Sequence, residues 1–396
     1  MTLTAQEQAI PAQRPRAKAA RPPRTETVSG IADIDGGRGH LRTAGYRRTP
    51  ADIPLPAALV RKYGLRRGDE VEGTTGASAT AGGGGGRSAS QSPLATVTTI
   101  NGLPADQARR RPHFDDLTPV YPTERLRLED GDASATARII DLIAPIGKGQ
   151  RGLIVAPPKA GKTMILKSIA RAIAVAHPEV HLMLVLVGER PEEVTDLRRS
   201  VHGEVVYSTF DESPADHIRA AELAIERAKR LAELGRDVVV LLDSLTRLGR
   251  AYNLAAPASS RTLTGGVAAA ALQPPRQFLG AARNLEEGGS VTIVSTVLID
   301  TGSALDSVLF EEFKGTGNME LRLRRDLAER RLFPAIDPAP SGTRREELLM
   351  EPAEHAAVVS LRRALAPLDP QRAVELLIDK TRDGNAPFLH QLKAAR

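Results

Sequence analysis

One short segment, residues 156–163 with the sequence Ala-Pro-Pro-Lys-Ala-Gly-Lys-Thr, constrains the fold of this chain more than any other. It follows an apolar run, 152–156, and opens an amphipathic stretch at 164–176. A strand, a tight loop ending in Gly-Lys-Thr and a helix form a phosphate-binding loop, because the backbone N–H groups and the dipole at the helix start attract an anion. We expect Lys162 to reach the outer phosphates of a nucleotide and the Thr163 hydroxyl to bind Mg²⁺.

The loop departs from the usual pattern at one position. Ala156 stands where such loops usually have their first glycine, so the strict pattern fails by one methyl group. The alternative is a proline-interrupted loop with a chance Gly-Lys-Thr. The strand–loop–helix context favours the phosphate loop.

Composition excludes several classes of protein. The chain has 396 residues, which predicts two or three domains, and 0 Cys, which excludes disulfides and thiolate metal sites. The longest apolar runs, such as 182–187 and 238–242, are far shorter than the roughly 20 residues of a membrane-spanning helix. The N-terminal segment lacks the apolar core of a signal peptide. We therefore expect a soluble cytoplasmic protein.

The positive charge is concentrated near the N-terminus. Residues 1–111 hold 17 Lys and Arg against 9 Asp and Glu, a net of +8, so the rest of the chain has a net of −2 within the total of +6. A basic N-terminal part on a neutral body suggests a polyanionic partner. A solvated basic tail without a specific partner is an equal alternative.

The chain divides into four segments. Residues 1–28 are rich in Ala, Pro, Arg and Gln and are expected to form a disordered basic tail. Residues 29–111 contain short strand-like pieces, including one at 95–100, and a glycine-rich insertion at 76–92 that is typical of a flexible linker. Residues 112–138 form an extended connector, and residues 139–396 form the main domain.

The main domain alternates between apolar strand-like runs and helical patterns, as a parallel α/β sheet requires. We predict strands at 153–156, 182–187, 205–208, 238–243 and 291–297, and helices at 162–176, 192–200, 215–234 and 244–252. From about Ala353 onward we expect short helices broken by Pro367, Pro370 and Pro387.

An aspartate at the end of a buried strand gives a second nucleotide signature. Residues 238–243 read Val-Val-Val-Leu-Leu-Asp, and Ser244 follows. Phosphate-loop enzymes use a carboxylate at this point of a core strand to hold the water shell of Mg²⁺. Aspartate also often caps a following helix. Its place about two βα units after the phosphate loop favours the metal role for Asp243.

A glutamate after another apolar strand is a candidate for water activation. The strand at 182–187 leads into Gly-Glu-Arg-Pro-Glu-Glu, residues 188–193. Glu192 and Glu193 are expected to be first-turn charges of a helix. Glu189 precedes the proline and lies outside that helix, so it is the better candidate to orient an attacking water beside a γ-phosphate.

From about Asp115 to Lys393, the chain resembles the Rho family of bacterial transcription termination factors, which are ATP-driven hexameric RNA translocases. The matching runs are 149–164 (GQRGLIVAPPKAGKTM), 189–194 (ERPEEV), 241–244 (LLDS), 263–266 (LTGG), 311–320 (EEFKGTGNME), 333–337 (FPAID) and 341–344 (SGTR). Ala156 also suits this family. The resemblance implies a RecA-type phosphate-loop ATPase domain in an α/β fold, preceded by a small β-barrel of the OB or cold-shock type.

The resemblance implies roles for residues around the nucleotide. Thr163 and Asp243 would hold Mg²⁺, Glu189 would activate water, Arg190 would contact the γ-phosphate, and Phe333 would stack on adenine. The ATP-binding set that it implies is Gly147, Lys148, Gly149, Gln150, Arg151, Gly152, Lys159, Ala160, Gly161, Lys162, Thr163, Met164, Arg190 and Phe333.

The resemblance also implies that the catalytic site is shared between subunits. Arg344 would be an arginine finger that reaches the site of the neighbouring subunit, and Arg325 would support the same site. A cation delivered in trans stabilises the charge of the transition state and couples hydrolysis to assembly. Without the resemblance, either arginine alone would be interpreted as a surface charge.

Two loops would line a central pore and contact RNA. They are 257–266 and 301–305, and the implied contact residues are Arg261, Thr262, Leu263, Thr264, Gly265, Gly266 and Ala304. Glycine-rich loops with a hydroxyl and a cation can follow a phosphate backbone without reading sequence.

The chain departs from the family pattern at three positions of the ATPase domain. Ala304 stands where the family places a basic residue facing RNA, and Ala268 stands where it usually has Asp. Gly188 replaces an Asp before the catalytic glutamate. The first of these predicts weak coupling between RNA binding and hydrolysis.

The N-terminal domain departs further. Residues 1–111 hold only two aromatic residues, Tyr46 and Tyr63, where family barrels stack aromatic side chains on RNA bases. Each stacked base contributes about 1–3 kcal/mol, so the loss should weaken the primary RNA site. Arg38 and Arg42 could bind phosphate instead, and His40 could replace one ring.

Together these features predict a hexameric RNA translocase and helicase that hydrolyses ATP with Mg²⁺, moves 5′ to 3′ on single-stranded RNA and dislodges the RNA polymerase elongation complex. Two alternatives stay open: a divergent paralogue with a narrower RNA-remodelling role, and a nucleotide-binding non-motor that modulates a true Rho by mixed assembly. The intact residues of the nucleotide site argue against the non-motor: Lys162, Asp243, Glu189 and Arg344. Ala304 and the aromatic-poor barrel argue for it.

Overall fold

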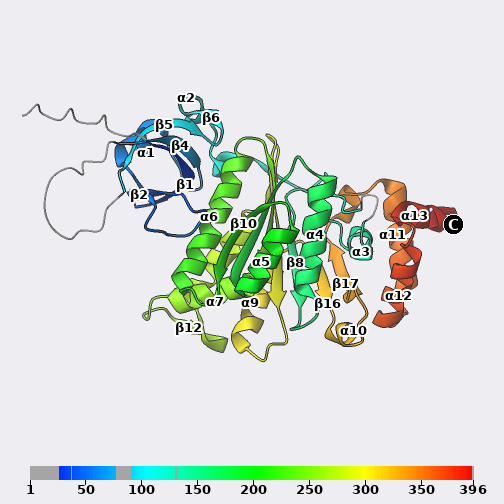
Figure 1. Ribbon diagram of the computed structural model, residues 1–396. Helices are drawn as coiled ribbons and strands as arrows, with labels where there is room; N and C mark the ends of the chain where they lie inside the picture. The colour runs from blue at the N-terminus through cyan, green and yellow to red at the C-terminus, as the bar shows by residue number, and fades with distance from the viewer. Residues whose placement is uncertain (1–25, 37, 77–90, 130–132, 395–396) are drawn as a thin grey trace, which may run out of the picture.

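The computed structural model describes residues 26–36, 38–76, 91–129 and 133–394, which form two large sheets, one two-stranded sheet and their helices (Figure 1). The predicted tail, 1–28, lies almost wholly outside the described residues, but β1 begins at Thr27, so the last two residues of that prediction are strand and not tail. The insertion, 76–92, also falls mostly outside them.

The N-terminal domain is an antiparallel sheet with the strand order β3-β2-β1-β4-β5-β6. Its elements are β1 (Thr27–Asp35), β2 (Arg38–Arg42), β3 (Ile53–Leu55), α1 (Ala57–Tyr63), β4 (Glu70–Thr75), β5 (Leu94–Ile100), β6 (Leu103–Pro104) and α2 (Ala105–Ala108). Leu41, Val71 and Ile100 pack in its interior. The sheet curls so that β3 approaches β5, which gives a half-barrel and confirms the predicted small β domain.

The second sheet carries the main domain and has the order β10-β9-β11-β15-β8-β16-β17. Its strands are β8 (Arg151–Ala156), β9 (His181–Glu189), β10 (Glu204–Thr209), β11 (Asp237–Asp243), β15 (Ser290–Leu298), β16 (Met319–Leu323) and β17 (Ile336–Thr343), with β7 (Pro119–Val120) and β14 (Arg283–Leu285) at its side. The strands pair in parallel except β17, β14 and β7, which pair antiparallel.

Helices cover both faces of this sheet because its central strands are apolar on both faces. On β8, Ile154 packs into one core with α3 and α4, whereas Leu153 and Val155 pack into the other with α6 and α7. The helices of eight or more residues are α3 (Ala135–Ile143), α4 (Lys162–Ala176), α5 (Pro191–Ser200), α6 (Pro214–Ala232), α7 (Leu245–Ala255), α8 (Gln273–Gly280), α9 (Ala304–Lys314), α11 (Pro352–Leu365), α12 (Pro370–Lys380) and α13 (Asn385–Ala394). The shorter ones include α10 (Arg325–Glu329) and the single turns η2 (Thr264–Gly266) and η4 (Glu346–Leu348).

The structure confirms all five predicted strands and all four predicted helices of the main domain, with ends that differ by a few residues. One prediction was wrong: Pro387 does not break a helix but lies in the first turn of α13, where a missing N–H costs nothing. The strand β16 reads Met-Glu-Leu-Arg-Leu and does not follow from the sequence pattern, because its charged residues interrupt the apolar run. In the described parts of the chain, no helix has both the length and the apolar character needed to cross a membrane.

The half-barrel rests on α6 of the main domain (Figure 1). Arg227 of α6 is buried and donates to Asn101 Oδ1 at 2.5 Å and to Glu70 Oε2 at 2.6 Å. Gly68 approaches the helix so closely that a Cβ atom there would lie 2.4 Å from the carbonyl carbon of Glu226. The close approach and the buried hydrogen bonds fix the half-barrel against the main domain.

Candidate nucleotide-binding site

The phosphate loop forms as predicted, between the end of β8 and the start of α4 at Lys162. Gly161 has a φ of 90°, which favours glycine, and a Cβ atom there would lie 3.4 Å from the Phe333 ring. Lys159 also has a positive φ, 66°. These conformations turn the chain sharply, so that the first N–H groups of α4 face the space beyond the sheet.

Three charged side chains meet at this edge of the sheet. Lys162 Nζ lies 2.7 and 2.8 Å from the two carboxylate oxygens of Asp243 and 3.1 Å from Glu189 Oε1. Because β8, β9 and β11 run parallel, their carboxyl ends meet here. Thr296, on the intervening β15, donates from Oγ1 to Asp243 Oδ1 at 2.7 Å. The structure therefore brings together the predicted phosphate-binding lysine, metal-binding aspartate and catalytic glutamate.

The charge balance of this cluster sets its protonation states. Burial raises the pKa of Glu189, and the neighbouring Asp243 raises it further, against the opposing effect of Lys162. Burial alone would lower the pKa of Lys162, but Asp243 and Glu189 outweigh it and leave this pKa above its usual value. Lys162 is therefore a firmly charged cation, while Glu189 is a stronger base than an exposed glutamate.

Arg247, on the first turn of α7, is a site residue that the sequence analysis missed. Its Nη1 lies 3.3 Å from Glu189 Oε1 and donates to the carbonyl oxygen of Gly188. Ser244 caps this helix by accepting from the N–H of Arg247 at 3.2 Å. No pattern in the sequence indicated this contact, because it depends on the end of β9 lying beside the first turn of α7.

A cavity of 390 Å³ opens beside these charges. Its walls are Lys159, Gly161, Lys162, Thr163, Met164, Glu189, Arg190, Glu193, Arg247 and Phe333. Most of the phosphate-loop residues predicted to bind ATP thus line the same cavity as Arg190 and Phe333. Ala160, which was also predicted to bind ATP, is buried and does not line the cavity. Phe333 is 36% exposed, so part of its ring surface is open to a ligand.

The residues proposed for Mg²⁺ suit that ion chemically. Thr163 supplies a hydroxyl oxygen on the cavity wall, and Asp243 supplies a buried carboxylate next to Lys162. Mg²⁺ usually takes one or two protein oxygens and completes its shell with waters and substrate phosphates. This pair therefore matches an ion that arrives with a nucleotide.

The predicted ATP-binding run Gly147–Gly152 does not reach this cavity within one chain. It lies where β8 begins, while the phosphate loop follows its end, roughly 17 Å away at about 3.3 Å per residue. Lys148 is buried in ion pairs with Glu124 and Asp237, and Gln150 donates to Asn318 Oδ1 at 2.6 Å. The prediction that this run contacts ATP is therefore wrong for the nucleotide of the same chain.

The two arginines predicted for a shared site lie at different edges of the sheet. Arg344 follows β17, and its N–H donates to the carbonyl of Asn318, whose Oδ1 accepts from the N–H of Arg151. Arg344 is therefore near the start of β8, away from the phosphate loop of its own chain. Arg325 begins α10 at the phosphate-loop edge and pairs with Glu329 at 2.8 Å.

The half-barrel exposes two of its three predicted RNA contacts. Arg38 and His40 are exposed on β2. Arg42 is buried, with ion pairs to Asp33 and Asp52. The prediction that Arg42 binds phosphate is therefore corrected, because two carboxylates inside the domain already hold its guanidinium.

The two predicted pore loops are neighbours. Residues 262–268 form a small hairpin, β12 (Thr262–Leu263) and β13 (Val267–Ala268), with η2 at its tip. A Cβ atom on Gly265 would lie 3.0 Å from the carbonyl oxygen of Ala304, at the start of α9. Arg261, Thr262, Gly266 and Ala304 are exposed. The juxtaposition matches the prediction, and contact with RNA stays a prediction.

Comparison with known proteins shows which class of protein this chain belongs to. Residues 136–343 match the model of the ATP synthase alpha/beta family, nucleotide-binding domain, and residues 28–106 match that of the Rho termination factor, RNA-binding domain. The chain is thus a phosphate-loop ATPase joined to an RNA-binding domain. It belongs to the Rho family of transcription termination factors, as the resemblance predicted.

Relatives named transcription termination factor Rho support this assignment over most of the chain. The protein of Streptosporangium roseum is 57% identical over 96% of this chain and 97% of its own length. That of Micrococcus luteus is 58% identical over 92% of this chain but only 54% of its own length. That of Streptomyces coelicolor is 56% identical over 93% of this chain and 86% of its own.

Solved structures show the same fold at low identity. A prototypical ATPase from the type III secretion system of pathogenic bacteria aligns with a TM-score of 0.56 and 23% identity, over 70% of this chain and 82% of that one. An ATP synthase subunit from Nanoarcheaum equitans aligns with a TM-score of 0.52 and 20% identity, over 63% of each chain.

Proposed function

We propose that this chain is the subunit of a hexameric ring that hydrolyses ATP to move 5′ to 3′ along single-stranded RNA and so terminates transcription. The observation that carries the proposal is the split of the catalytic set: Lys162, Glu189 and Asp243 converge at one edge of the sheet, and Arg344 lies at the opposite edge. A complete site then needs two copies of the chain, which a ring provides.

Hydrolysis begins with an exchange of partners at Lys162. In the structure its ammonium group neutralises two carboxylates, and the phosphates of ATP compete for the same cation. When Lys162 moves to the phosphates, Glu189 loses its nearest cation and becomes free to orient and deprotonate the attacking water. Mg²⁺, held by Thr163 and Asp243, would neutralise charge on the phosphate oxygens.

Arg247 keeps Glu189 from being left with an unpaired charge during this exchange. Its guanidinium lies 3.3 Å from the same carboxylate oxygen that Lys162 contacts. Arg190 is exposed on the cavity wall and would contact the γ-phosphate, while Arg344 of the neighbouring subunit would stabilise the developing charge. Arg325 would support this shared site from the phosphate-loop edge.

RNA would be held mainly through its phosphates. The exposed Arg38 and His40 offer a cation and one ring, and the sequestered Arg42 removes the third predicted contact. Affinity should therefore fall steeply with salt and show little preference for cytosine-rich RNA. The natural target is nascent RNA of a transcribing RNA polymerase, which would place the protein in the cytoplasm.

The experiment that tests this function is the rate of ATP hydrolysis with Mg²⁺, measured with and without single-stranded RNA. We expect hydrolysis that RNA stimulates. A ring that binds ATP but does not hydrolyse it under either condition would contradict the proposal.

The alternative, a non-motor subunit that modulates a true Rho, rests on one residue: the exposed Ala304 brings no cation to the proposed pore loop. Ala304→Lys separates the two functions. If the chain is a motor with weak coupling, this variant should raise RNA-stimulated hydrolysis and leave the rate without RNA nearly unchanged. If the chain is a non-motor, neither rate should rise.

A further inference from the structure

The segment that carries Arg344 turns sharply beyond β17. The next residue, Arg345, adopts a left-handed φ of 58°, and η4 follows immediately. A residue with a side chain adopts this conformation at a cost, and it persists only where the surroundings hold it. The contacts around this turn therefore identify what fixes the place of Arg344.

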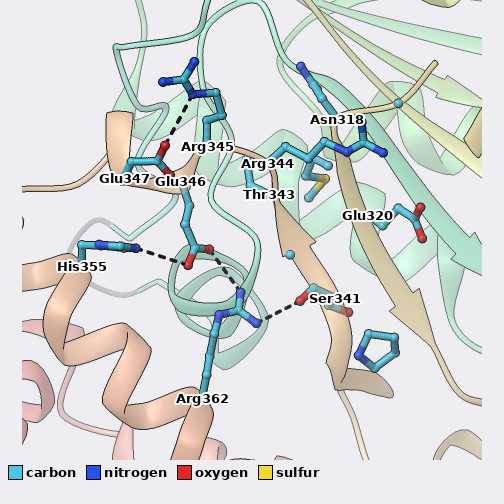
Figure 2. A pocket seen from close by; sticks show the side chains of 14 residues that line it. Asn318, Glu320, Ser341, Thr343, Arg344, Arg345, Glu346, Glu347, His355 and Arg362 are labelled. Atoms are coloured by element: carbon cyan, nitrogen blue, oxygen red, sulfur yellow. Dashed lines mark hydrogen bonds and ion pairs between the residues drawn. The ribbon is translucent and has the colours of Figure 1, made fainter. Parts of the chain in front are cut away.

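Arg362, on α11, contacts both sides of the turn (Figure 2). Its Nη1 donates to the carbonyl oxygen of Ser341 at 3.0 Å, and its Nη2 lies 3.3 Å from the carboxylate of Glu346. The same Nη2 also donates to the carbonyl oxygen of Ile143 at the end of α3. A planar guanidinium can hold several acceptors in fixed directions at once, which an ammonium group cannot.

The guanidinium of Arg344 forms no hydrogen bond or ion pair in the parts of the chain that the structure describes. Only the backbone N–H of Arg344 has a partner there, the carbonyl oxygen of Asn318 at 2.8 Å. Figure 2 shows its side chain extending away from the Arg362–Glu346 pair. The adjacent Arg345 is already occupied, because it lies over the Tyr121 ring at 4.7 Å and beside Glu347.

We propose that Arg362 is a positioning residue for ATP hydrolysis: by tying Ser341 to Glu346 across the turn, it holds Arg344 where a neighbouring subunit's nucleotide can receive it. This inference rests on the proposed function, in which Arg344 acts in trans. Arg362 lies outside the cavity of the phosphate loop, so its role would be to hold Arg344 and not to contact the nucleotide of its own chain. Its loss would leave the finger present but misplaced, and a displacement of about 1 Å can lower a catalytic rate by about a hundredfold.

The first test is steady-state kinetics of Arg362→Gln in the full chain. We expect kcat to fall by about tenfold to a hundredfold and the KM for ATP to stay within about twofold, because the phosphate loop that holds ATP is unchanged. The kcat of Arg362→Lys should also stay low, since the positive charge remains but the planar guanidinium with its several donors is lost. Arg363→Gln is the matched control, because Arg363 is an exposed neighbour on the same helix and should be dispensable.

The second test is a double-mutant cycle read by single-turnover hydrolysis. In an Arg344→Ala chain, Arg362→Gln should cause no further loss, because no finger remains to be positioned. A general structural role would instead multiply the two losses and overturn the inference. If Arg362→Gln prevents ring assembly, Glu346→Gln replaces it in the same cycle, and wild-type kcat in that variant would equally overturn the inference. Full activity of Arg344→Ala alone would instead refute the shared site on which the inference rests.

Discussion

At the scale of single residues, the site is built around a cation with two carboxylate partners. Lys162 lies within 3.1 Å of Glu189 and within 2.8 Å of Asp243, and it is the phosphate-binding lysine that the Gly-Lys-Thr sequence predicted. The sequence could predict each of these residues because each follows an apolar strand. It could not predict Arg247, since only the fold shows that the first turn of α7 faces Glu189.

We expect Lys162→Ala to abolish ATP hydrolysis, with a loss of at least about a thousandfold in kcat/KM, because the outer phosphates lose the cation that neutralises them. The measurement is hydrolysis at saturating Mg²⁺. Lys167→Ala is the matched control: this lysine lies on the same helix, but its partner is the exposed Asp196. Undiminished hydrolysis in Lys162→Ala would show that the nucleotide lies elsewhere.

The raised pKa of Glu189 predicts how activity depends on pH. The ionised carboxylate is the active base, so hydrolysis should fall as the pH drops through its pKa. Burial and the neighbouring Asp243 raise that pKa, so the loss should begin at a higher pH than for an ordinary glutamate. The pH profile of kcat under single turnover measures this, and Arg247→Gln should shift its acid limb to higher pH, because a cation that favours the carboxylate is lost. An acid limb that does not move would argue against Glu189 as the base.

At the scale of elements, the alternation of apolar strands and helices predicted the central sheet, whereas β16 and β17 needed the structure. On β2, the sequence pattern made Arg38, His40 and Arg42 look equivalent, because alternate residues of a strand share one face. The fold separates them, since Asp33 and Asp52 close over Arg42 and leave the other two exposed.

This separation predicts opposite effects for two arginines on one strand. Arg42→Ala should destabilise the half-barrel by about 3–5 kcal/mol, because it leaves buried carboxylates unpaired. Arg38→Ala should leave the melting temperature unchanged and weaken RNA binding, most strongly at low salt. Thermal unfolding and salt-dependent RNA binding of both variants test the pair. A stable Arg42→Ala protein with weakened RNA binding would restore that residue as an RNA contact.

At the scale of the whole molecule, the chain joins a half-barrel, fixed on α6, to an ATPase domain whose proposed catalytic groups lie at opposite edges of one sheet. The phosphate loop predicted the ATPase domain, and the resemblance to the Rho family implied the small β domain before it. No pattern within the sequence could show that Arg344 lies at the far end of β8 from Lys162, because that arrangement depends on β17 running antiparallel to β16. Under the proposed function, this geometry would make a single chain an incomplete catalyst.

The measurement that tests this claim most directly is ATP hydrolysis by mixed rings of Arg344→Ala and Glu189→Ala subunits. Each variant alone should keep only a small residual rate of hydrolysis, because the first lacks its finger and the second lacks its base. In rings mixed at random in equal amounts, about one interface in four combines an intact Glu189 with an intact Arg344 from the neighbour, so hydrolysis should reappear. If mixed rings form and no mixing ratio restores hydrolysis, the site is not shared between subunits.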